Sequence, residues 1–400
     1  MKESLQEELS LVGIKVEGLK VKIENMEEVN EKKEAINLRS HINKDLGKMI
    51  KHMDVDGDAS DEIKSNQKKT DDTDLEDHPE VAQRYFNIGY TQYHMKNYQS
   101  ALESHMKALK IRLKLYGEND PATADSYYSI GAVEQDRGDY KSALEYYERA
   151  LEISLKLYGK DHCDTADTYY SIGITQHAMH DYQASIESNR KALNIRLRLH
   201  GEGHPLTADS YYCIGIAQHE MKDYKSALES HEKALEIRLK VYGDDDLATA
   251  DSYYNIGYAQ HDMKDYMSAL KSKRKALEIR LGLRGEDYPE TADSYYSIGV
   301  TQHEIREYTS ALESYQKALE IRLKIYGKDH AATADSYYNI GVTQHEMKHY
   351  KSAFIRIEKL LKSDRHYMEK ITLTQFKFIT QLVRYSVSSQ MTSNSNENSC

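Results

Sequence analysis

The fold is most evident in residues 207–215, Thr-Ala-Asp-Ser-Tyr-Tyr-Cys-Ile-Gly, because close copies of this stretch return throughout the middle of the chain. The glycine that ends the stretch recurs with a 42-residue period, and the period never changes. A spacing that never slips indicates that every copy occupies an equivalent place in a regular stack. The copies form seven units, with their repeat glycines at Gly89, Gly131, Gly173, Gly215, Gly257, Gly299 and Gly341.

The composition carries the same signal in its aromatic residues. The chain of 400 residues contains 33 Tyr but only 4 Phe and no Trp. Four recurring positions in the 42-residue unit account for 24 of the 33 tyrosines. The tyrosine excess therefore comes from the copying of one unit, and a low-complexity tract is not needed to explain it.

Each unit has the apolar period of two helices. Apolar side chains recur at spacings of three, four and seven, which is typical of amphipathic helices, and residues 221–224 separate the two runs with a tight turn. In each of the first six units, a second glycine follows the repeat glycine at a constant distance, as Gly243 follows Gly215. This glycine predicts a left-handed cap at the end of the second helix. All four prolines of the chain fall near the start of a first helix, where proline is tolerated. The sequence therefore predicts an all-α fold.

Composition and charge exclude several classes of function. No apolar run approaches the ~18 residues that span a bilayer, and we expect a cytoplasmic protein with no membrane partner. A net charge of −11 argues against nucleic acid as a partner, because phosphate binding needs a basic surface. Three scattered cysteines do not suit a disulfide framework or a cysteine-based zinc site. We expect no cofactor and no metal.

The repeated residues resemble the tetratricopeptide repeat (TPR), whose pattern is a large aromatic residue, Leu-Gly, and then Tyr, Ala and Ala at set distances. The 42-residue unit, with runs such as Ala-Leu-Glu-Ile-Arg-Leu-Lys at 318–324, is similar to the long variant of kinesin light chains and nephrocystin-type proteins. The resemblance covers about three quarters of the chain and implies a right-handed superhelical solenoid of seven helix-turn-helix repeats. In one unit the matching residues are Tyr211, Ile214, Gly215, Tyr224, Ala227 and Ala234.

The sequence predicts five segments. Apolar residues from Leu5 to Met26 alternate by four and three, so residues 1–53 are expected to form a heptad, coiled-coil-like helical segment. Residues 54–77 are a charged linker, and residues 78–362 contain the seven repeats. A capping helix at 363–385 is expected to cover the end of the stack, and the Ser/Asn-rich tail at 386–400 is expected to be disordered.

The resemblance also places a candidate binding site on the first helix of each unit, which lines the concave groove in TPR proteins. The groove is expected to accept a peptide or protein with basic and aromatic groups, since Tyr supplies contact area and the acids steer a basic partner. Histidine protonation is expected to add positive charge below about pH 6.5. The predicted groove residues are Tyr128, Tyr170, Tyr212, Tyr254, Tyr296, Tyr338, Ile174, Ile216, Tyr258, Val300, Val342, His177, His219, His261, His303, His345, Asp167, Asp209, Asp251 and Asp293.

These features predict a non-enzymatic scaffold that binds a protein partner, and two finer forms stay open. One is a kinesin-light-chain-like cargo adaptor that binds kinesin heavy chain through residues 1–53. The other is a ciliary or cytoskeletal assembly module of the nephrocystin type. A remote alternative is a zinc peptidase, because residues 345–349 spell the His-Glu-x-x-His motif, in which two histidines bind zinc and Glu346 acts as base. A single Asp-to-His change within the repeat explains the same motif without any metal.

Overall fold

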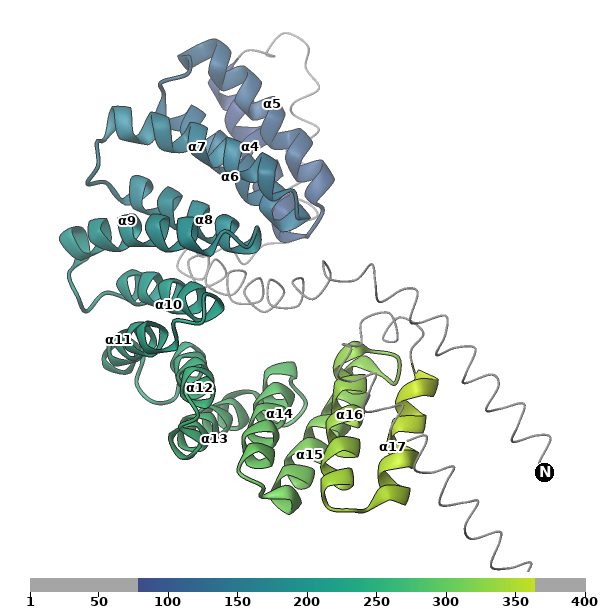
Figure 1. The fold of residues 1–400 in the computed structure, drawn as a ribbon. Coiled ribbons are helices and arrows are strands. Elements are labelled where there is room, and N and C mark those ends of the chain that lie inside the picture. Colours follow the sequence, from purple (N-terminus) through teal and green to yellow (C-terminus); the bar gives the residue numbers. More distant parts are fainter. Residues whose placement is uncertain (1–77, 364–400) are drawn as a thin grey trace, which may run out of the picture. The chain divides into compact units, whose positions relative to one another are not determined.

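The computed structural model describes residues 78–363, and the predicted segments at 1–53, 54–77, 363–385 and 386–400 lie outside this range except for residue 363. The described residues form α-helices in consecutive helix-turn-helix pairs, with no strand among them (Figure 1). This confirms the predicted all-α repeat fold. None of these helices is long and apolar enough to cross a membrane.

The helices belong to two compact units, which divide at the end of the fourth pair. Residues 78–241 form the first unit and residues 242–363 the second. The first contains α4 (Pro79–His94), α5 (Tyr98–Tyr116), α6 (Pro121–Arg137), α7 (Tyr140–Leu157), α8 (Cys163–Ala178), α9 (Tyr182–His200), α10 (Pro205–Glu220) and α11 (Tyr224–Tyr242). The second contains α12 (Leu247–Asp262), α13 (Tyr266–Arg284), α14 (Pro289–Glu304), α15 (Tyr308–Tyr326), α16 (Ala331–Glu346) and α17 (Tyr350–Ser363).

Most first helices begin with a residue that caps their free backbone N–H groups. The Asp120 carboxylate accepts a hydrogen bond from the backbone N–H of Ala122 at 2.9 Å, and Pro121 occupies the first helical position. The His204 ring nitrogen Nδ1 accepts from the N–H of Leu206 at 3.3 Å in the same way. The four prolines therefore stand where the sequence predicted, at positions where no backbone donor is lost.

The glycines that follow the second helices differ from the prediction. Gly201 has φ 81° and ψ −180°, and Gly117 has φ 80° and ψ −173°. The positive φ was predicted, but the left-handed α conformation was wrong, because ψ is extended and carries the chain out toward the next first helix. Only glycine readily adopts this region. The left-handed α conformation occurs at the turn inside a pair, at Gly138, with φ 88° and ψ 8°.

Small residues bring the two helices of a pair into close contact. Gly215 lies within α10, and a Cβ atom added there would stand 2.7 Å from the His231 ring of α11. Ala227 and Ala234 of α11 are fully buried. A larger residue at Gly215 would therefore clash with the His231 ring and disturb the packing of α10 against α11.

Candidate functional site

The predicted groove residues all lie on first helices, from α6 to α16, and their exposure is uneven. Sixteen of the twenty are partly exposed, and four are buried. The buried ones are Tyr212, Ile174, His177 and Asp251, each at most 6% exposed. The stripe that the sequence predicts is therefore partly inside the fold, and the contacts of each residue class show why.

The aspartates of the predicted groove are paired with arginines of the second helices. Their carboxylates accept from a guanidinium N–H at 2.7–2.8 Å, and the arginine side chains are only 3–6% exposed. Each of the four carboxylates is therefore paired with a buried arginine, and although only Asp251 is itself buried, they do not form the free acidic edge that was expected. The pairs are Asp167–Arg196, Asp209–Arg238, Asp251–Arg280 and Asp293–Arg322.

Each such arginine lies at the junction of its repeat with the next one, as Arg280 illustrates. The Arg280 guanidinium lies over the Tyr254 ring, 4.4 Å from its centre, in a cation–π contact. Its NH1 group donates to the Ser294 hydroxyl at 2.7 Å and to the Glu290 carbonyl at 3.0 Å, both on the next first helix. Burial alone lowers the pKa of Arg280, but the Asp251 carboxylate and other nearby groups raise it more, so the net shift is upward. The charge is therefore retained in the interior.

Sequence reasoning missed this arginine, although a signal was present. An arginine recurs in five of the seven repeats, inside an apolar run such as Ala-Leu-Glu-Ile-Arg-Leu, where a lone surface charge is not expected. The second repeat breaks the pattern, since Ser154 stands in the arginine position. Asp125, the equivalent carboxylate, has no arginine facing it from α7, and burial raises its pKa. The arginines of the pattern are Arg112, Arg196, Arg238, Arg280 and Arg322.

The hydroxyl groups of several predicted groove tyrosines bond within the chain. Most of these bonds reach a residue of the next first helix, so they tie neighbouring repeats together. The bonds are Tyr128–Ser171 at 2.9 Å, Tyr170–Cys213 at 3.4 Å, Tyr254–Tyr258 at 3.4 Å and Tyr296–Asn339 at 2.6 Å.

The histidines of the predicted groove pack against tyrosines that begin the second helices. Their ring centres lie 5.2–5.3 Å apart in all five repeats that carry the histidine. Two of them also bond to the next repeat: His261 Nδ1 lies 3.1 Å from the Thr301 hydroxyl, and His303 Nδ1 lies 3.0 Å from the Thr343 hydroxyl. Burial lowers the pKa of these two histidines. They therefore gain their charge below the usual pH range of an exposed histidine.

In α10, α12, α14 and α16, the apolar residue one position after the repeat glycine remains partly open to solvent. Ile216, Tyr258, Val300 and Val342 are all half-buried, and they recur once per first helix. On α14, Glu304 lies four residues beyond Val300 and is exposed. These apolar side chains recur at the same position of each of these helices and remain accessible to a partner.

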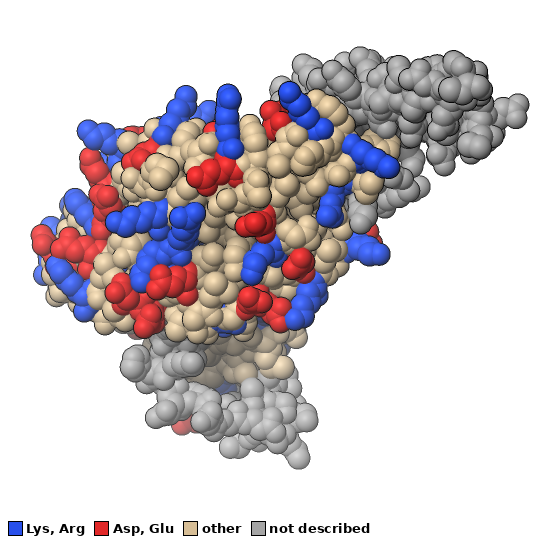
Figure 2. Space-filling view, turned by 90° about the horizontal axis from the view of Figure 1, so that it is seen from below, with Lys and Arg blue, Asp and Glu red and all other residues tan. Residues whose placement is uncertain are grey.

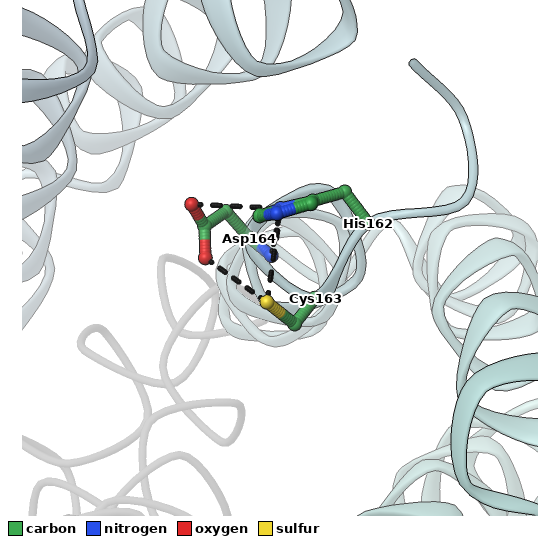
Figure 3. Close-up of side chains that lie close together, drawn as sticks. All are labelled: His162, Cys163 and Asp164. Carbon is green, nitrogen blue, oxygen red and sulfur yellow. Dashed lines mark hydrogen bonds and ion pairs between the residues drawn. The ribbon is translucent and has the colours of Figure 1, made fainter. Parts of the chain in front are cut away.

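A second candidate site lies at the start of α8. The donor atoms of His162, Cys163 and Asp164 lie within 4.8 Å of one another, the one group of three such residues between 78 and 363 (Figure 3). However, His162 Nδ1 already accepts a hydrogen bond from the backbone N–H of Asp164 at 3.2 Å. The equivalent His204 Nδ1 accepts one from the backbone N–H of Leu206. Partial burial and Asp164 raise the pKa of the Cys163 thiol. The arrangement is therefore that of a capped helix start.

The His-Glu-x-x-His motif does not have the backbone that zinc peptidases need. In that motif both histidines lie on one helix, a turn apart. Here α16 ends at Glu346, and Lys348 has φ 63°. His345 lies in the last turn of α16, and His349 falls in the connection before α17. The geometry gives no support to the peptidase alternative.

The molecular surface carries both signs of charge side by side. On the face shown in Figure 2, Lys and Arg side chains are interspersed with Asp and Glu, and no broad area of one sign is visible there.

The helical pairs recur at a constant 42-residue interval and are joined by similar contacts. This arrangement defines a helical-repeat protein. The model of the Tetratricopeptide repeat family matches residues 80–156, 122–198, 164–240, 206–281, 249–324 and 306–365. The chain therefore belongs to the tetratricopeptide repeat family. No curated protein matches it in sequence.

Several solved structures are similar to this chain. BtubC (BKLC) from P. vanneervenii is 18% identical, with a TM-score of 0.51, over 57% of this chain and 92% of that chain. The apo form of RapI is 18% identical, with a TM-score of 0.56, over 72% and 99%. A putative kinesin light chain of Podosopora anserina with nearly identical TPR-like repeats is 16% identical, with a TM-score of 0.46, over 52% and 98%. At these identities the first two likenesses show the fold alone.

Proposed function

We propose that this protein is a non-enzymatic scaffold that binds a segment of a partner protein along its first helices. The observation that carries the proposal is the recurrence of a partly exposed apolar side chain at the same position of successive first helices, as at Tyr258 of α12, Val300 of α14 and Val342 of α16. A TPR stack repeats such a position at regular intervals, so one extended or helical segment can contact several repeats in turn.

The basic character of the partner has weaker support than the sequence suggested, because the predicted aspartates pair with arginines. Exposed Glu304 and Glu346 lie one helical turn beyond the apolar positions Val300 of α14 and Val342 of α16, and they are not among the aspartates that pair with arginines. A partner with a single basic residue next to an apolar one would complement this edge.

A peptide-display selection on the full chain tests the proposal. A selected peptide should bind at least tenfold more weakly to a Val300→Ala, Val342→Ala double variant, because both changes remove contact area from neighbouring first helices. Exposed Glu320→Ala, on the second helix α15, serves as the matched control and should leave affinity unchanged. Equal affinity for both variants, with melting temperatures preserved, would refute binding along the first helices.

The kinesin-light-chain-like adaptor is a finer form of this proposal. The 42-residue repeat and the heptad pattern of residues 1–53 support it. Deletion of residues 1–53 should then abolish co-purification with a kinesin heavy chain while the selected peptide still binds. Retained co-purification would remove the adaptor mechanism and leave the general scaffold. The cytoskeletal assembly module and the cytoplasmic location remain predictions of the same kind.

A further inference from the structure

A lysine is buried at the junction of the fifth and sixth repeats, within the second unit. Lys273 belongs to α13 and is 1% exposed. It lies 16 positions after the repeat glycine Gly257, and its Cγ atom is 2.6 Å from the place where a Cβ on that glycine would stand. Lysine is almost never fully buried unless a charged group accompanies it. The surroundings of this amine therefore decide what it does.

The amine of Lys273 bonds to neutral groups of the next first helix, α14. Its Nζ donates to the Thr301 hydroxyl at 2.9 Å and to the Ser297 carbonyl at 3.3 Å. On the side of α12 it lies over the Tyr258 ring, 4.7 Å from the ring centre. None of the carboxylates between residues 78 and 363 forms an ion pair with it. A charge on this amine is therefore buried without a counter-charge.

The other repeats place an uncharged side chain at the position of Lys273. Burial lowers the pKa of His105 to about 4 and that of His231 to about 3, so both rings are neutral at pH 7. The fifth repeat is therefore the one that puts an aliphatic amine into the interior at this position. The equivalent residues are His105, Tyr147, Asn189, His231, Tyr315 and Ile357.

Arg280, on the same helix, shows how the stack keeps a buried charge. Its guanidinium pairs with the Asp251 carboxylate at 2.8 Å, and both side chains are almost fully buried. Lys273 lacks such a pair, so burial disfavours its protonated form. Burial lowers the pKa of Lys273 to about 7, against a smaller upward influence of Asp262. The amine therefore changes its charge near neutral pH.

The helices packed against α13 bring few other titratable groups to this amine. From α12 they are Tyr258, His261 and Asp262, and α14 adds Glu304, which acts on His261 and not on Lys273. Burial raises the pKa of Tyr258 and lowers that of His261, so both are neutral from pH 7 to 8.5. Within this interval, the group of the junction that changes its charge is Lys273.

We propose that the junction of the fifth and sixth repeats is a proton-controlled hinge, which opens more readily when the Lys273 amine is protonated. The protonated amine is fully hydrated only when α13 and α14 separate, so protonation favours the opened junction. The neutral amine keeps its bonds to Thr301 and Ser297 without a buried charge, so deprotonation favours the closed junction.

The direction of the effect follows from the pKa of the amine in the two forms. In the opened junction the hydrated Lys273 has its ordinary pKa of 10.5, and in the closed junction its pKa is about 7. Between these two values the opened form binds more protons, so opening becomes rarer as the pH rises. The opening equilibrium constant should fall about fifteenfold from pH 7 to 8.5. Well below pH 7 both forms are protonated, and Lys273 adds no further change.

Hydrogen exchange of the full chain at pH 7 and pH 8.5 tests the hinge. Exchange rates in α13 and α14, divided by those of the unfolded chain at the same pH, should fall about fifteenfold over this interval. Lys273→Met keeps a stem of similar length without the amine and should show no such fall. Lys271→Met, exposed on the same helix, is the matched control and should retain the full effect. Equal rate ratios at both pH values in the unaltered chain, or a fall that persists in Lys273→Met, would overturn the proposal.

NMR of the lysine side chains covers the case in which Lys273→Met does not fold. The ¹³Cε signals of the full chain report the protonation of each amine directly. One signal should titrate with a midpoint near pH 7, and it should be absent from Lys273→Tyr, which copies the second and sixth repeats. A chain in which every lysine titrates above pH 9 would refute the hinge. Both measurements use the chain without a peptide, so their outcome does not depend on the proposed function.

Discussion

The arginine that joins neighbouring repeats gives a direct test of how the stack is held together. Arg280 and Asp251 are 5% and 6% exposed, and their side chains lie 2.8 Å apart. Arg280→Met keeps a long apolar stem but removes the charge, so the Asp251 carboxylate stays buried without a partner. The loss of one partner of a buried ion pair costs about 3–5 kcal/mol of unfolding free energy.

Urea unfolding of the full chain, followed by circular dichroism and by hydrogen exchange in α12 to α14, measures this loss. The double variant Arg280→Met, Asp251→Leu removes both charges and should recover most of it, because apolar replacement of a buried pair is often close to neutral. Lys240→Met breaks an exposed ion pair with Glu236 and should leave the unfolding midpoint unchanged. A loss below about 1 kcal/mol for Arg280→Met, or a double variant no more stable than the single one, would rule out this explanation.

Three further predictions concern the first unit. Ser154→Arg places an arginine opposite Asp125 and should raise the unfolding free energy by about 1 kcal/mol in urea unfolding. Ser154→Met is the uncharged control, and an equal rise in unfolding free energy for both variants would contradict the prediction. Neither ring nitrogen of buried His177 has a hydrogen-bond partner, whereas the equivalent His261 and His303 each bond to a threonine of the next repeat, where Ala217 stands beside His177. Ala217→Thr supplies that hydroxyl and should be about 1 kcal/mol more stable in urea unfolding than the isosteric Ala217→Val, and equal stability of the two variants would contradict this. Burial lowers the pKa of His231 to about 3, so the unfolded chain binds more protons below pH 6.5 and stability falls as the pH drops. His231→Tyr should remove roughly 3 kcal/mol of that loss at pH 4, and an unchanged pH profile of thermal unfolding would count against it.

The fold could be predicted from sequence because its signals are local and repeated. Gly215, Ala227 and Ala234 recur at fixed spacings, and each acts within one helical pair. The 42-residue interval then places every pair in the same way. The conformation of the loop glycine was less accessible, because a positive φ alone does not determine ψ, and the path to the next helix sets it.

The candidate site was harder to predict, because its contacts join residues far apart in sequence. Asp251 lies 29 residues before Arg280, and Ser294 lies 14 residues after it. An aspartate that recurs on the first helices has the same sequence pattern whether its side chain faces a ligand or an internal arginine.

Hydrogen exchange of the full chain, with and without a display-selected peptide, shows directly whether partners bind along the first helices. We expect slower exchange on peptide binding in the first helices α12, α14 and α16, with the second helices α13 and α15 unchanged. Protection confined to the second helices, or spread equally over both helices of every pair, would show that the partner binds elsewhere.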